Sequence, residues 1–109
     1  MEVGRTLGFL VLIQLCFGIS VFAAVGVTVH PAKASLTLSE PQQFTATVVN
    51  TTNHGVFWAV DGIRGGNATV GTISTSGLYH PPGKRSTHTI TATSAAQSSA
   101  VGSAEVWVT

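Results

Sequence analysis

The chain has 109 residues, of which only 8% are charged, and its formal net charge is +1. Such a low charge excludes the strongly basic surface by which proteins hold nucleic acid or an acidic membrane. The hydrophobic fraction of 44% excludes a disordered chain, and the length suits one domain.

The N-terminus has the pattern of an export signal. Arg5 precedes an uncharged, apolar stretch over residues 7–24, and Val21 and Ala23 supply a branched and a small residue where a signal peptidase would read −3 and −1. We therefore predict a signal peptide at residues 1–23 and a mature domain at residues 24–109, secreted or held at the cell surface or in the periplasm. The alternative is an uncleaved anchor, since the apolar run is long enough to span a bilayer.

The single cysteine, Cys16, lies inside this apolar stretch. The predicted mature domain therefore has no disulfide. A domain of this size without disulfides must be stabilised by dense apolar packing.

After the signal segment, the chain alternates between apolar and polar residues with the period of two that β-strands show. We predict about seven short strands, separated by turns rich in Gly, Pro and Asn. The alternating segments cover residues 25–29, 35–38, 44–49, 56–60, 68–79 around a turn at 74–77, 89–93 and 104–108. Residues 64–67 and 81–84 are predicted to be loops, and residues 94–103 are predicted to be the end of a strand followed by a flexible hairpin loop. This pattern predicts an all-β sandwich.

The phase of each strand also predicts the interior. Trp58 is expected at the centre of the sandwich, facing a second strand that carries a large aromatic residue. The expected core residues are Phe44, Trp58, Val60, Ile90 and Val106.

Six pieces of the chain, in this order, resemble the bacterial immunoglobulin-like domains (group 2 type) of adhesins and large surface proteins. They are VTVHP at 27–31, QQFTATV at 42–48, VFWAVDG at 56–62, GGNATVGTIS at 65–74, GLY followed by PP at 77–82, and TITATS at 89–94. The resemblance implies an immunoglobulin-like sandwich with a non-catalytic role in adhesion. In one departure, Ser39, Glu40 and Pro41 stand where the family carries a Gly-containing turn.

The sequence predicts no enzyme activity. No catalytic motif joins the carboxylates to the histidines, and Asp61, which precedes Gly62, is expected to serve a turn. A small hydrolase would need a pocket that gathers a histidine with Asp61 or Glu105, and the strand phases do not predict one. The four histidines are widely spaced and are expected in surface loops, so we predict no metal site and no cofactor: His30, His54, His80 and His88.

Two aromatic side chains fall on the solvent phase of their strands. Phe57 and Trp107 are expected on one outer face, on either side of the strand that carries Thr91, two strand spacings or about 10 Å apart. An exposed face of aromatic and threonine side chains suits stacking on a sugar or packing against a partner protein. Alternatively, each ring is covered by a loop or by the side chain of Arg64 or Lys84.

The function expected from the sequence is therefore a non-catalytic extracellular module for cell-surface adhesion, in contact with polysaccharide or a cell-surface protein and not with nucleic acid. The alternative is a purely structural spacer or capping domain without a ligand. The first strand, residues 25–29, is an edge strand with few charges, so weak self-association by strand addition is a further hypothesis.

Overall fold

The computed structural model describes residues 24–109, and the predicted signal peptide or anchor at residues 1–23 lies outside this range. Within residues 24–109 the regular structure consists of β-strands. This part of the chain has no helix that is long and apolar enough to cross a membrane.

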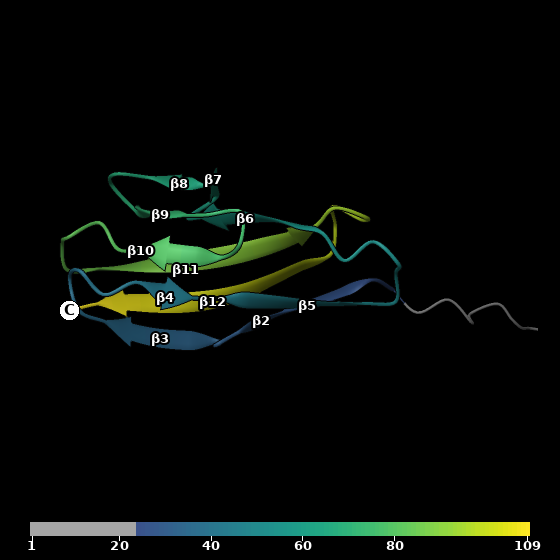
Figure 1. Cartoon of the computed structure of the whole chain (residues 1–109), viewed down its shortest axis with the longest axis horizontal. Coiled ribbons are helices and arrows are strands. Elements are labelled where there is room, and N and C mark those ends of the chain that lie inside the picture. Colours follow the sequence, from purple (N-terminus) through teal and green to yellow (C-terminus); the bar gives the residue numbers. More distant parts are fainter. Residues whose placement is uncertain (1–23) are drawn as a thin grey trace, which may run out of the picture.

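The strands lie in two layers, as in a β-sandwich (Figure 1). One layer is built around an antiparallel pair formed by the two longest strands, β11 (Ser86–Ser94) and β12 (Val101–Val108). β6 (Val56–Val60) pairs with β11 in antiparallel orientation, and β3 (Lys33–Leu36) pairs with β12 in parallel orientation. The order in this layer is β3 (Lys33–Leu36), β12 (Val101–Val108), β11 (Ser86–Ser94), β6 (Val56–Val60) and β7 (Ile63–Arg64).

The other layer is made of shorter strands. β2 (Gly26–His30) pairs with β5 (Thr45–Val49). Phe44 separates β5 from the two-residue β4, and its amide donates a hydrogen bond of 2.8 Å to the carbonyl oxygen of Gly77. The rest of this layer has the order β4 (Gln42–Gln43), β10 (Leu78–His80), β9 (Gly71–Ile73) and β8 (Gly66–Asn67).

The apolar core lies between the layers, where the strand phases predict it. Trp58 is 6% exposed, and the other four expected core residues are fully buried. The indole packs against Gly77, whose φ is +88°. A Cβ atom there would lie 2.4 Å from the Phe44 carbonyl oxygen and 2.9 Å from the indole ring, so this position requires glycine.

The chain changes layer several times, and two of these passages lie at opposite flanks of the sandwich. On one flank, the passage from β2 to β3 lies at the cis peptide bond His30–Pro31. On the other flank, it lies at Gly65, between β7 and β8. The Gly65 amide donates to the Trp58 carbonyl oxygen, and the Gly65 carbonyl oxygen accepts from the Ile73 amide, both at 3.0 Å. A single residue therefore joins the two layers by backbone hydrogen bonds.

One predicted loop is wrong. Residues 64–67, predicted as a loop, contain the end of β7 and all of β8, because these residues pair with β6 and β9. At residues 94–103 the predicted strand end is present, since β11 ends at Ser94, but the hairpin loop is shorter than predicted because β12 already begins at Val101. A strand of two residues is too short to show an alternation of apolar and polar residues. The residues near Gly102 are small and do not alternate clearly, so the start of β12 could not be recognised.

Candidate functional site

The β6–β7 hairpin determines where the charged side chains of this region lie. Its turn consists of Asp61 and Gly62, with φ values of 49° and 81°, and Val60 pairs directly with Ile63. An Asp-Gly pair with positive φ at both positions is the preferred two-residue hairpin turn. The turn places Arg64 opposite Ala59, so Arg64 and Phe57 share one face of the sheet.

Arg64 covers one face of the Phe57 ring. The guanidinium carbon lies 3.9 Å from the ring centroid, a stacked cation–π contact. Phe57 is still 45% exposed, and Arg64 is also exposed. Within residues 24–109, no carboxylate forms an ion pair with Arg64. The expected cover by Arg64 is therefore present, but it leaves a charged planar group at the surface.

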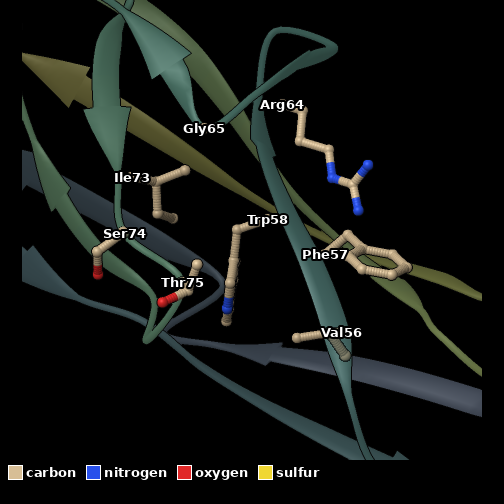
Figure 2. Close-up of a pocket in the computed structure, with 8 residues that line it drawn as sticks. All are labelled: Val56, Phe57, Trp58, Arg64, Gly65, Ile73, Ser74 and Thr75. Carbon is tan, nitrogen blue, oxygen red and sulfur yellow. The ribbon is translucent and has the colours of Figure 1, made fainter.

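A cleft of about 280 Å³ opens beside this pair, which we call the edge cleft (Figure 2). Figure 2 shows Phe57 and Arg64 on one side of the β6 ribbon and Trp58, Ile73 and Thr75 on the other. The cleft therefore lies at the flank of the sandwich and not on a flat sheet face. Its lining residues are Val56, Phe57, Trp58, Arg64, Gly65, Ile73, Ser74 and Thr75.

A second hollow of about 240 Å³ lies next to Ala59, Gly62 and Thr93, and it shares Phe57, Trp58 and Arg64 with the edge cleft. Trp58 is buried to 94%, yet its Nε1–H makes no hydrogen bond with any residue in the described range. An indole N–H that is buried usually has an acceptor.

Trp107 does not belong to this site. β11 lies between β6 and β12, as expected, but Phe57 pairs with Thr93 whereas Trp107 pairs with Thr87. These partners are six positions apart on β11, so the rings are separated by roughly 20 Å along the strand as well as by two strand spacings. The predicted separation of about 10 Å is therefore wrong. Thr91 lies between them, half-buried, opposite Ala59 and Ser103.

Trp107 is half-buried, and the nearest cation over its ring is Lys33, with Nζ 6.0 Å from the centroid. This distance is at the outer limit of a cation–π contact. Neither of the two hollows beside Phe57 includes Trp107 or Thr91 among its lining residues.

At the start of β11, the end opposite to the edge cleft, Asp61, His88 and Ser86 form a polar chain. His88 Nδ1 lies 2.6 Å from Asp61 Oδ2, and His88 Nε2 lies 2.8 Å from Ser86 Oγ. The Thr89 amide donates to Asp61 Oδ1 (2.8 Å), and the Asp61 amide donates to the Thr89 carbonyl oxygen (2.9 Å). The polar chain thus fastens the β6–β7 turn to the start of β11.

The expectation that the histidines lie in surface loops is wrong for His88, which is buried in β11. Its ring lies beside Asp61, which occupies the turn expected for it. The period of β11 contained the signal, since His88 is in phase with the buried Ile90. The strand phase could not show that Asp61 reaches His88 from the turn. The other three histidines, His30, His54 and His80, are exposed.

The polar chain has the order of acid, base and hydroxyl that serine hydrolases use. However, the Ser86 hydroxyl donates a hydrogen bond of 2.9 Å to the Lys84 carbonyl oxygen. Neither of the two hollows described above borders these residues. With its polar atoms bonded within the protein, the arrangement holds the β6–β7 turn against β11.

Two pKa values are displaced around this chain. Partial burial acts to raise the pKa of Asp61, but the hydrogen bond from the Thr89 amide, with the hydrogen bond and charge of His88, outweighs it and lowers the pKa. Burial, assisted by the negative charge of Asp61, raises the pKa of Tyr79 to about 12. The Tyr79 hydroxyl donates to the Val70 carbonyl oxygen at 2.7 Å, so Tyr79 is a neutral core residue.

Within residues 24–109, no cluster of three His, Cys, Asp or Glu side chains is placed to hold a metal ion.

The backbone of β2, the strand for which self-association is a hypothesis, lies close to the other layer. A Cβ atom at Gly102 of β12 would lie 2.6 Å from the Val27 carbonyl oxygen.

The sequence matches no protein-family model and no curated protein. The functional interpretation therefore depends on the geometry of the described residues.

Proposed function

We propose that residues 24–109 form an immunoglobulin-like domain of the bacterial type. Several features support this proposal. β3 pairs in parallel with the last strand, β12, after the chain has changed layer. β6 carries the buried Trp58 beside β11, as the central strands of immunoglobulin domains do. Export by the segment at residues 1–23 belongs to the same proposal, and the intact mass of the exported protein tests it.

The function we propose is non-catalytic binding outside the cytoplasm, in adhesion to polysaccharide or to a cell-surface protein. The edge cleft carries this proposal. It combines an exposed aromatic ring, an arginine without a carboxylate partner among residues 24–109, and a buried indole N–H without an acceptor there. A buried donor such as the Trp58 N–H normally has a partner within the protein or an ordered water. A concave site with a few convergent polar groups is typical of ligand binding.

Binding of the full chain to arrays of polysaccharides and of cell-surface proteins tests this function. We expect retention on at least one class of ligand, and we expect Phe57→Ala to reduce it because the substitution removes both the ring and the support of Arg64. Trp107→Ala is the matched control, since it removes an aromatic side chain on the same face but away from the cleft.

The alternative function is a spacer or capping domain without a ligand. The absence of binding to every array by a chain that is shown to be folded would favour this alternative. Equal retention of wild type and Phe57→Ala would leave adhesion standing but would remove the edge cleft as its site.

A further inference from the structure

The edge cleft presents hydrogen-bond donors that the described part of the protein does not use. Arg64 offers the planar edge of its guanidinium, which has no carboxylate partner within residues 24–109. Trp58 offers an indole N–H from a side chain that is 94% buried. A buried donor without an acceptor costs free energy unless water or a ligand satisfies it.

The charge of the cleft has one sign. Its one charged lining residue is Arg64. The Phe57 ring lies against one face of the guanidinium at 3.9 Å and so restricts its orientation. A guanidinium held in this way is suited to a carboxylate, which it binds through two parallel hydrogen bonds. The ligand should therefore be rich in acceptors and carry a carboxylate.

The shape of the cleft argues against an extended peptide. β7 and Gly65 already pair with β6 from Trp58 to Val60. This leaves Val56 and Phe57 as the unpaired stretch on this side, which is too short for a peptide to add as a strand. The volume of about 280 Å³ lies near the lower limit of small-molecule sites. Apolar side chains, Val56 and Ile73, and the hydroxyl of Thr75 complete the walls.

We propose that the edge cleft binds a carboxylate-bearing sugar unit, a hexuronate within an acidic polysaccharide. Arg64 takes the carboxylate on the outer side of β6, and the sugar spans the edge of β6, so that a hydroxyl group reaches the Trp58 N–H and the C–H groups contact Val56 and Ile73 on the inner side. This proposal rests on the proposed binding function and specifies its ligand.

Titration of the full chain with polygalacturonate tests the ligand class. Neutral dextran, dextran sulfate and poly-L-glutamate serve as the comparison polymers. We expect polygalacturonate to bind and neutral dextran not to bind, with dextran sulfate and polyglutamate weaker than polygalacturonate. Arg64→Ala should weaken binding by about 10-fold to 100-fold, as expected for the loss of a charged hydrogen bond.

Three further variants distinguish this site from general attraction of polyanions. Arg85→Ala removes the same charge from an exposed position away from the cleft and should leave binding unchanged. Arg64→Lys keeps the charge but loses the bidentate geometry, so it should bind more weakly than wild type. Trp58→Phe keeps an aromatic ring and removes the N–H, and it should weaken binding while circular dichroism shows a folded chain.

Several results would overturn the proposal. Equal losses for Arg64→Ala and Arg85→Ala would show non-specific attraction of a polyanion. Tighter binding of dextran sulfate or polyglutamate, with the same dependence on Arg64, would assign the cleft to a sulfated sugar or to an acidic protein. Arg64-dependent binding of neutral dextran would exclude the acidic ligand while keeping the binding function. No binding to any polysaccharide would remove the carbohydrate function as well.

Discussion

The β6–β7 hairpin supplies two charged side chains that differ in their bonding partners. Asp61, in the turn, has the His88 ring and the Thr89 amide as partners. Arg64, three residues later, has one face against Phe57 and no carboxylate partner within residues 24–109. One charge is used within the protein, and the other is left available to the solvent.

The difference separates stability from binding within one short segment. Groups whose hydrogen bonds are completed by the protein contribute to its folding, and their loss leaves buried partners unsatisfied. A group that is oriented by its neighbours but not bonded by them contributes little to folding and is ready to bind a ligand. Substitutions in the two places should therefore have opposite effects on unfolding and on binding.

The largest effect on stability is expected for His88→Ala. The substitution removes a buried ring and leaves Asp61 and Ser86 each without one hydrogen-bond partner. We expect the free energy of unfolding to fall by about 2–3 kcal/mol, measured by urea denaturation, with ligand binding by the folded fraction unchanged. Loss of binding without loss of stability would reverse the roles assigned to the two regions.

A smaller effect is expected for the pH dependence of stability. Because the pKa of Asp61 is lowered in the folded protein, its contribution is fully present above the ordinary aspartate pKa of about 3.9 and is lost as the pH falls through the lowered pKa. Stability should therefore fall on acidification, and Asp61→Asn should make this fall shallower. Urea denaturation at a series of pH values between neutral and strongly acidic measures it, and parallel curves for the two proteins would contradict the assignment.

Arg64→Ala should have a still smaller effect on stability. The contact with Phe57 is exposed, and such cation–π contacts contribute about 0.5–1 kcal/mol. Thermal unfolding should show little change, in contrast to the loss of ligand binding. A destabilisation as large as that of His88→Ala would mean that Arg64 is a structural residue and that the comparison fails.

The smallest effect on binding is expected for Trp107→Ala, which should leave ligand affinity at the wild-type value. Its ring is more than two strand spacings from Phe57 because of the six-residue offset along β11. Titration with the same polysaccharide measures this affinity. A loss equal to that of Phe57→Ala would require one ligand to span both rings.

The alternation in residues 56–60 was sufficient to predict the interior. It placed Trp58 and Val60 inside and Phe57 outside, and their exposures follow that phase. This inference works because each layer has one dry face, so the burial of successive side chains alternates. The same phase places His88 on the buried side of β11 with Ile90, so for this residue the strand period is a better guide to burial than the average exposure of histidine.

What the sequence could not provide was the relation between strands. The offset between Phe57 and Trp107 depends on the register of two pairings, which no single strand encodes. Nor could it reveal β7 and β8, whose two residues each show no period. The edge cleft lies where β7, Gly65 and β6 meet, so the cleft could not be predicted. The exposure of Phe57 was predicted, and cover by Arg64 was one of the alternatives considered for its ring.

The crossing at Gly65 has a consequence for how the protein behaves at high concentration. On this flank the layers end in β7 and β8, with two residues each, and the chain between them is bonded to both layers. Fibril growth needs an exposed strand edge that is long enough to pair with a strand of a neighbouring molecule, and this flank offers no such edge. This flank therefore ends in two short edge strands, one of which carries the charged Arg64, and both features disfavour the addition of a strand from a neighbouring molecule.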